Sequence, residues 1–287
     1  MILKTAIEKV EKILSVLPKD ILEKLKISKY RTMILNPDEE IRFKLFNTYC
    51  LIFQYIAHKE NINVDRNVLT DYTTMNILEY LNGIFYDSVY DNKDIIKLPA
   101  ANILFRHYIR LAEDLNIEID RARDTFECYF YKPNTVKIGK IDMDTARELD
   151  VTWAKTINGF ATSVNIVDHY VKYYIKNEKW SHFFRNYLLY RQLLDDVNDF
   201  VQDYKNNEIK SYGLLALVKF FKSKKKINLK NPVTAFFYQL YVLRNYKKIY
   251  DEIIMRFEEE VSRTMQVEEF YRIMDELEEF QDKYDKS

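Results

Sequence analysis

Four aspartates lie within nine positions of the segment LLYRQLLDDVNDFVQDYK, residues 188–205, surrounded by leucine, valine, phenylalanine and tyrosine. On an α-helix, which turns by about 100° per residue, the four carboxylates share an arc of about 100° and the apolar residues fill the opposite arc. They belong to Asp195, Asp196, Asp199 and Asp203. Like charges four residues apart cost about 0.2–0.5 kcal/mol each, so a solvated helix face normally mixes both signs. Either this is such a face, or a divalent cation neutralises it; Mg²⁺ binds carboxylate oxygens together with substrate phosphates.

A second acidic segment, YLNGIFYDSVYDNKD, covers residues 80–94. Asp87 and Asp91 are four residues apart and share one helix face, with Asp94 close to the same arc. They come at the end of an apolar helix, where the backbone already carries partial negative charge, so a metal ion again offers the missing compensation. Two such helices facing each other would hold several Mg²⁺ ions, bridged by a diphosphate.

The elements that must position these carboxylates are helices. The 287 residues include only 4 Gly and 5 Pro, too few for the turns of a β-sandwich or an α/β fold. Apolar residues recur with helical periodicity almost throughout, which predicts one all-α domain over residues 1–287. The expected helices cover about residues 2–15, 18–27, 38–58, 64–92, 99–115, 117–131, 143–177, 180–206, 211–222, 231–262 and 266–284.

Charge and cysteine content exclude several classes of protein. Acidic and basic residues balance at 44 each, which disfavours a nucleic-acid partner. Cys50 and Cys128 form no motif, as in a reduced intracellular protein. The first residues carry Glu8 and Glu11, unlike a signal peptide, and no run of eighteen uncharged apolar residues occurs. We therefore expect a cytoplasmic protein without a transmembrane helix, and a homodimer remains open.

The two acidic segments resemble the aspartate-rich motifs of the class I isoprenoid synthases, which include terpene synthases and trans-prenyltransferases. FYDSVYD is similar to the first motif, with Asp87 and Asp91 in its outer positions and Ser88 where a second aspartate is usual. QLLDDVNDF is similar to the DDxxD second motif of prenyltransferases. The same segment also fits the triad spacing of terpene synthases, at Asp195, Asp199 and Asp203, with aspartate in the positions where that triad has Asn, Ser/Thr and Glu.

A third segment, WAKTINGFATSVNIV, resembles the Lys-Thr helix that precedes the second motif in prenyltransferases. The resemblance implies that Lys155 and Thr156 contact the substrate diphosphate and that Gly159 lines the cavity. Lys210 resembles a basic residue that contacts diphosphate beyond the second motif. Arg147 lies near the place of a diphosphate-sensing arginine in terpene synthases, and a surface or capping role is the alternative.

The family implies an α-helical bundle around a deep apolar cavity, with both acidic motifs at its mouth and three Mg²⁺ ions. The metal ligands would be Asp87, Asp91, Asp195, Asp199 and Asp203. The residues that act in catalysis would be Asp87, Asp91, Asp195, Asp199 and Lys155. The substrate would be a small prenyl diphosphate, and the abundant tyrosine and phenylalanine suit a cavity that stabilises a carbocation.

Three residues share the helix face of the first motif, one to two turns before it: Tyr80, Gly83 and Ile84. If Asp87 and Asp91 mark the mouth of a cavity, these residues line its wall. Glycine inside a helix costs about 0.5–1 kcal/mol relative to alanine, so Gly83 requires a reason. Close packing against another helix and room for a prenyl chain are both consistent with the sequence.

The sequence departs from the prenyltransferase pattern where the second substrate, isopentenyl diphosphate, binds. The paired arginines that follow the first motif are absent from NKDIIKLP, and SKYRT only partly matches the N-terminal Gly-Lys-x-x-Arg site. We therefore expect a terpene synthase that acts on one allylic diphosphate; the alternatives are a prenyltransferase and a non-catalytic partner subunit. His107 and His169 are interpreted as helix histidines satisfied by their surroundings, not as bases.

Overall fold

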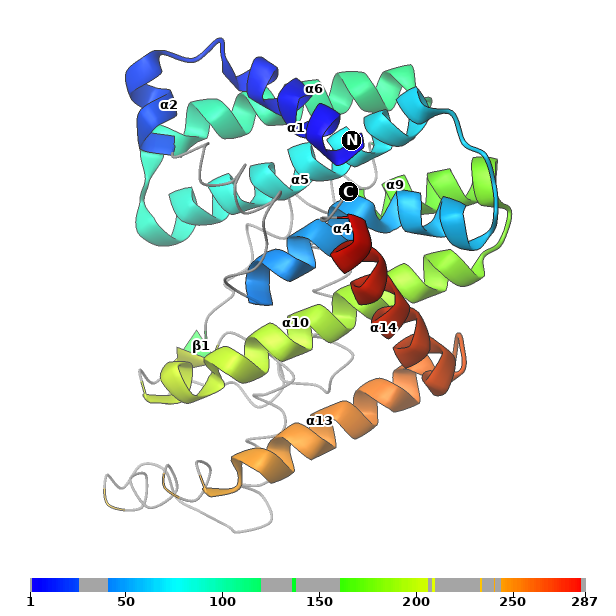
Figure 1. Ribbon diagram of the computed structural model, residues 1–287. Coiled ribbons are helices and arrows are strands. Elements are labelled where there is room, and N and C mark those ends of the chain that lie inside the picture. The colour runs from blue at the N-terminus through cyan, green and yellow to red at the C-terminus, as the bar shows by residue number, and fades with distance from the viewer. Residues whose placement is uncertain are drawn as a thin grey trace. The chain divides into compact units, whose positions relative to one another are not determined.

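The computed structural model describes residues 2–25, 41–119, 136–137, 161–205, 208–209, 233, 240 and 244–284, with side chains described except at residues 41–49, 87, 90–92, 136–137, 161, 195–205, 208–209, 249 and 282–284. This part of the chain is almost entirely helical, which confirms the all-α class (Figure 1). It contains nine α-helices: α1 (Ile2–Leu14), α2 (Lys19–Leu25), α4 (Ile41–Lys59), α5 (Arg66–Asn92), α6 (Leu98–Asp114), α9 (Ala161–Tyr170), α10 (Lys179–Lys205), α13 (Tyr246–Val261) and α14 (Val267–Tyr284).

Helical periodicity located most of these helices well. The ends of α1, α2, α5, α6, α10 and α14 lie within two residues of the predicted ends. A 3₁₀ turn, η1 (Ile95–Lys97), joins α5 to α6, and Pro99 falls in the first turn of α6, where proline costs no hydrogen bond. A π-helical turn, η3 (Val171–Ile175), follows α9.

The structure corrects the predicted helices at two places. The helix expected from residue 117 does not start there, because Asn116 has a left-handed backbone (φ 55°) and the Ile117 N–H closes α6 on the carbonyl of Ala112 at 2.8 Å. The helix expected over 231–262 is interrupted at Asn245, directly before α13.

Two short strands were also missed. β1 (Val136–Lys137) pairs antiparallel with β2 (Glu208–Ile209). Pairs this short carry too little alternation to be recognised from sequence.

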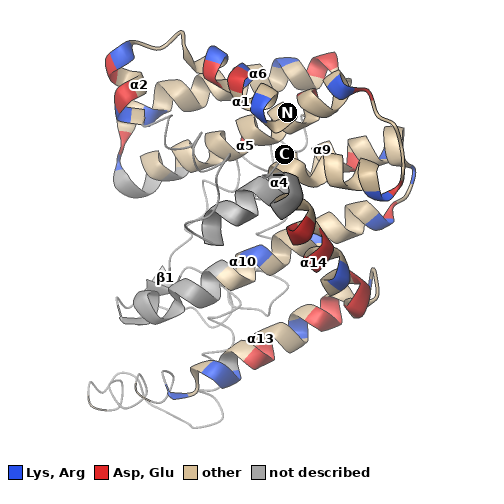
Figure 2. Cartoon of the chain, in the orientation of Figure 1, with Lys and Arg blue, Asp and Glu red and all other residues tan. Residues whose placement is uncertain are grey.

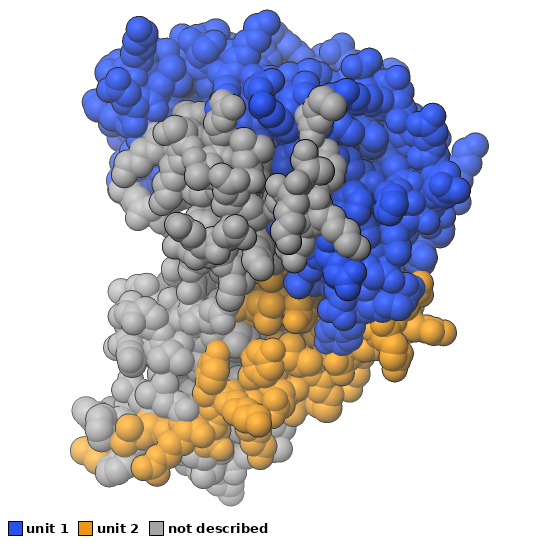
Figure 3. Space-filling model, viewed as in Figure 1, with its two compact units in different colours: residues 1–122, 162–181, 271–287 blue, residues 123–161, 182–270 orange. Residues whose placement is uncertain are grey.

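The chain forms two compact units (Figure 3). The first comprises residues 1–122, 162–181 and 271–287, and the second comprises residues 123–161 and 182–270. Both units are therefore built from separate stretches of the chain. The single-domain organisation stays a prediction.

In the first unit, α5 packs against α1, α4 and α6. Figure 1 shows α5 running beside α6. Every residue from 72 to 79 is buried, so this part of α5 has no solvated face. The polar side chains in it therefore need partners inside the protein.

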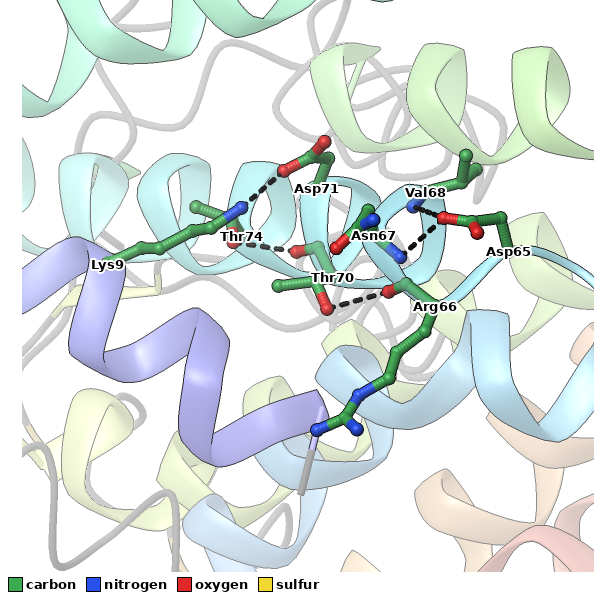
Figure 4. A network of polar contacts seen from close by, with 8 residues as sticks. All are labelled: Lys9, Asp65, Arg66, Asn67, Val68, Thr70, Asp71 and Thr74. Carbon is green, nitrogen blue, oxygen red and sulfur yellow. Dashed lines mark hydrogen bonds and ion pairs between the residues drawn. The ribbon is translucent and has the colours of Figure 1, made fainter.

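The N-terminus of α5 is capped by Asp65, whose Oδ1 accepts the backbone N–H of Asn67 at 2.8 Å and of Val68 at 3.4 Å (Figure 4). Asp71, two turns further along, forms an ion pair with Lys9 of α1 at 2.7 Å. The cap satisfies backbone donors that the helix itself cannot use, whereas the ion pair lies at the surface.

His169 links α9 to α5. Its Nδ1 lies 2.6 Å from the hydroxyl of Tyr72, and it also hydrogen-bonds the backbone of Asn116. A neutral imidazole that donates to the Asn116 carbonyl accepts the Tyr72 O–H at Nδ1. The expectation that this histidine is satisfied by its surroundings is therefore confirmed.

Aromatic packing holds the described part of the second unit together. The ring of Phe270 lies 5.7 Å from that of Phe183 and 5.4 Å from that of Phe257. Tyr190 contacts Phe257 at 5.3 Å. These contacts join α10, which carries the second acidic segment, to α13 and the start of α14.

We predict that Asp65→Ala lowers the free energy of unfolding by about 1 kcal/mol, because two helix-terminal N–H groups lose their acceptor. Asp71→Asn removes only an exposed ion pair and is expected to cost at most a few tenths of a kcal/mol. Urea denaturation of both variants measures the difference. A larger loss in Asp71→Asn than in Asp65→Ala would contradict this ranking.

The contact between His169 and Tyr72 predicts a pH-dependent stability. Burial, aided by the charge of Lys172, lowers the pKa of His169 below its usual 6.5, against the opposing effect of the Asn116 bond. The folded protein therefore resists protonation, so this contribution to stability is complete above pH 6.5 and is lost as the pH falls below it. Wild type and His169→Gln, compared by urea denaturation between about pH 8 and pH 5, should converge toward low pH. A stability difference between them that grows toward low pH would contradict the assignment.

Candidate functional site

The first acidic segment lies at the C-terminal end of α5, where the sequence placed it. Asp87 and Asp91 belong to the last two turns of this helix, and their side chains lie outside the described ones. The helix ends at Lys93, which has a left-handed backbone (φ 57°) and donates its N–H to the carbonyl of Ser88. The backbone therefore turns away immediately after the acidic residues.

Lys97 provides a cation beside this helix end, which the sequence analysis missed. Its Nζ donates to Ser88 Oγ at 2.7 Å and lies 3.3 Å from Asp94 Oδ2. A cation near a helix C-terminus is favourable because it faces partial negative charge. The available signal was the position of this lysine just after the predicted end of the helix. The segment NKDIIKLP was considered only because it lacks the paired arginines of prenyltransferases.

The second acidic segment lies within α10, as predicted. Asp195, Asp199 and Asp203 belong to this helix, which continues two residues beyond the last of them. Leu193, on the expected apolar arc, is buried at 2% exposure. The carboxylates themselves lie outside the described side chains. Asp87 and Asp91 belong to the first unit, and the three aspartates of α10 belong to the second.

Five further candidates lie outside the described residues: Arg147, Lys155, Thr156, Gly159 and Lys210. Lys210 directly follows β2, whose backbone is held by β1. The other four precede α9 in the chain. Their assignments stay predictions.

The expected cavity residues Tyr80, Gly83 and Ile84 are all half-buried. A Cβ at Gly83 would meet no heavy atom within 4 Å in the described part of the chain, and no described glycine has a positive φ. Close helix packing, one of the two explanations for this glycine, therefore finds no support there. Open space beside Gly83 is what the cavity explanation requires.

A buried polar group that the sequence did not reveal lies one turn before Gly83. Glu79 is 7% exposed and accepts a hydrogen bond from Thr162 Oγ1 of α9 at 2.9 Å. Tyr108 of α6 is 2% exposed, and its hydroxyl has no hydrogen-bond partner in the described structure. Burial and, second, the negative charge of Glu79 raise the pKa of Tyr108. Only the fold brings Thr162 of α9 to Glu79 of α5.

The charges on α13 can be compared with the four aspartates that share one face of α10. This helix carries both signs along its length (Figure 2), and Arg256 Nε lies 3.6 Å from Glu252 Oε1 one turn earlier. The sequence of α10 has no such alternation between Asp195 and Asp203. Among the side chains that the structure describes, no three His, Cys, Asp or Glu lie close enough together to hold a metal ion.

None of the described helices has both the length and the apolar composition needed to cross a bilayer. Comparisons with protein-family models, with curated proteins and with solved structures gave no match. The likeness to the class I isoprenoid synthases therefore rests on the three quoted segments.

We predict that Gly83→Ala raises the free energy of unfolding by about 0.5–1 kcal/mol, because alanine favours the helix and its methyl group meets no described neighbour. The adjacent Asn82→Ala should have the opposite effect. Asn82 is buried and donates to the Ala101 carbonyl at 2.6 Å, so its truncation is expected to cost about 1–3 kcal/mol. Thermal melts of both variants test these predictions. Destabilisation by Gly83→Ala would mean that other atoms occupy the space around the Cβ position of residue 83, and it would contradict the prediction.

Proposed function

We propose that this protein is a class I isoprenoid synthase, which ionises an allylic prenyl diphosphate with the help of Mg²⁺. The observation that carries the proposal is the pair of acidic repeats, Asp87/Asp91 on α5 and Asp195/Asp199/Asp203 on α10, each with four-residue spacing in an all-α chain. The narrower assignment is a terpene synthase. A prenyltransferase that also uses isopentenyl diphosphate is the second candidate.

The donor chemistry of the two repeats fits Mg²⁺. Carboxylate oxygens are hard ligands, and four-residue spacing places successive carboxylates on one helix face. Ser88 and Asp94 fit less well, because the ammonium of Lys97 already contacts both. Asp87 and Asp91 would therefore hold metal on α5, and Asp195, Asp199 and Asp203 would hold it on α10. When bound, Mg²⁺ would stabilise the negative charge of the leaving diphosphate.

The chain's own residues would contribute charge and a dry surface. Breaking the carbon–oxygen bond leaves both electrons on the diphosphate, so cations near its oxygens lower the barrier. Lys155 and Lys210 are proposed for this role from the resemblance, and Lys97 is added because it lies beside the first repeat. The half-buried Tyr80 and Ile84 would face the prenyl chain.

The spacing of the second repeat separates the two candidates. The terpene-synthase triad uses Asp195, Asp199 and Asp203, whereas the DDxxD motif of prenyltransferases uses Asp195, Asp196 and Asp199. The poor matches at the binding sites for isopentenyl diphosphate favour the synthase. Lys155-Thr156 and the DDVND sequence favour the transferase.

We predict that the purified protein, with Mg²⁺ and geranyl, farnesyl or geranylgeranyl diphosphate, releases diphosphate and forms a product without it. Asp87→Asn and Asp199→Asn should lower the rate by at least about 100-fold, because each removes a proposed metal ligand. A chelator should abolish the activity. Asp71→Asn, on the surface of the same α5, is the matched control and should keep the rate.

Two further variants decide between the candidates. Asp203→Asn should reduce the rate strongly and Asp196→Asn only weakly if the triad is used. The reverse pattern, together with incorporation of isopentenyl diphosphate into a longer prenyl diphosphate, would establish the transferase. Full activity of Asp87→Asn and Asp199→Asn, or no diphosphate release from any of the three substrates, would reject the proposed function.

A further inference from the structure

A hydrogen bond between a phenol and an imidazole lies in the core of the first unit. The hydroxyl of Tyr72 on α5 is 2.6 Å from Nδ1 of His169 on α9, and Tyr72 is fully buried. The imidazole also hydrogen-bonds the backbone of Asn116, and with the carbonyl as acceptor there, Nε2 keeps the proton of the ring. Nδ1 is then the acceptor, so the O–H group of Tyr72 is directed at a nitrogen base.

The surroundings keep both partners of this hydrogen bond uncharged. Burial lowers the pKa of His169 below its usual 6.5, against the opposing effect of the Asn116 hydrogen bond and together with the charge of Lys172. Burial also raises the pKa of Tyr72, so the phenol keeps its proton at neutral pH. A phenol that loses an electron, in contrast, becomes a strong acid and gives its proton to a hydrogen-bonded imidazole. The pair is therefore arranged for a proton transfer that accompanies oxidation of Tyr72.

Further aromatic rings connect this pair with the surface. The ring of Tyr173, in the π-helical turn η3, lies 4.3 Å from that of His169, and Tyr173 is 56% exposed. On the inner side, the rings of Tyr170 and Tyr174 lie 5.0 Å and 5.9 Å from that of Tyr72. Centroid separations of about 4.5–7 Å are typical of aromatic rings in contact. An exposed phenol thus contacts the imidazole, and the imidazole contacts a buried phenol.

We propose that Tyr72 is a site of reversible one-electron oxidation, with His169 as its proton acceptor and Tyr173 as the residue through which the electron leaves. The oxidant is a one-electron oxidant in solution, such as the carbonate radical anion, which becomes carbonate when it takes the electron. Tyr72 loses that electron, and the proton of its O–H bond moves to Nδ1 of His169. The products are a neutral tyrosyl radical and an imidazolium ion.

A one-electron reductant reverses this step. The ascorbate monoanion, for example, gives one electron to the tyrosyl radical, becomes the ascorbyl radical and releases its own proton to water. The proton on Nδ1 of His169 then returns to the oxygen of Tyr72. The cycle leaves the chain unchanged.

Other buried tyrosines have weaker bases as partners. The hydroxyl of Tyr170 donates to the Phe53 carbonyl at 3.1 Å, and that of Tyr55 donates to the carboxylate of Glu276 at 3.2 Å. A carboxylate is a weaker base than an imidazole, and an amide carbonyl is weaker still. Of these three tyrosines, Tyr72 is therefore the easiest to oxidise with loss of its proton. Its burial also separates the radical from reactive molecules in solution.

Flash photolysis of the full chain tests the site without Mg²⁺ or a prenyl diphosphate, so the outcome is independent of the proposed function. Light and a cobalt(III) pentaammine complex convert tris(bipyridine)ruthenium(II) to ruthenium(III), which is a one-electron oxidant. Wild type should form a long-lived tyrosyl radical, measured by transient absorption and electron paramagnetic resonance. With histidine labelled by the heavy nitrogen isotope, the radical should show magnetic coupling to a histidine nitrogen.

Variants identify the residues involved. Tyr72→Phe should lose the long-lived radical, whereas Tyr250→Phe, which removes a half-buried phenol of the second unit, should keep it. His169→Gln should lower the yield of the radical at least about tenfold, because an amide accepts the hydrogen bond but not the proton. Tyr173→Phe should slow formation of the radical several-fold and leave its lifetime unchanged.

A wild type without a long-lived radical, or equal yields in wild type and His169→Gln, would overturn the proposal. An undiminished long-lived radical in Tyr72→Phe would overturn it as well. If Tyr72→Phe does not fold in thermal melts, the labelled wild type decides, because a long-lived radical without coupling to a histidine nitrogen would reject Tyr72. An unchanged rate of formation in Tyr173→Phe would reject Tyr173 as the exit for the electron.

Discussion

Burial of residues 72–79 of α5 on all sides is the constraint on which the first unit depends. A helix with no solvated face satisfies its backbone internally, but each polar side chain on it must find a partner in the protein. Asn82 reaches the Ala101 carbonyl of α6, and Glu79 accepts from Thr162 of α9. Specific hydrogen bonds thereby fix how neighbouring helices lie along α5, which apolar contacts alone would leave free to slide.

The end of the same helix resolves a conflict visible in the sequence. Acidic residues at a helix C-terminus oppose the backbone dipole, and Asp87 and Asp91 lie in the last turns of α5. Lys97 brings an ammonium to Ser88, so part of the negative charge is compensated without any ligand. A protein that relied on metal alone for this compensation would carry a greater penalty whenever the metal was absent.

Sequence periodicity predicted the helices because long helices repeat one apolar pattern many times. It located α5 and α10 with their acidic repeats. It also identified Gly83 as a glycine inside a helix, which is unfavourable relative to alanine and therefore requires an explanation. It missed the contact between Glu79 and Thr162, because α5 and α9 must pack together before these side chains become neighbours. It also missed Lys97, whose role follows from the left-handed cap at Lys93, a backbone conformation that the sequence does not specify for lysine.

The assembly of the first unit from distant segments has a consequence for synthesis on the ribosome. The hydroxyl of Tyr55 in α4 pairs with Glu276 in α14, across 221 positions of the chain. Its ring also packs against Phe280, with the centroids 5.6 Å apart. Because translation proceeds from the N-terminus, α4 is made long before these partners exist. The aromatic surface of α4 that contacts α14 therefore stays exposed to solvent or bound by a chaperone until α14 has been synthesised. Folding of this unit is completed only after translation of α14.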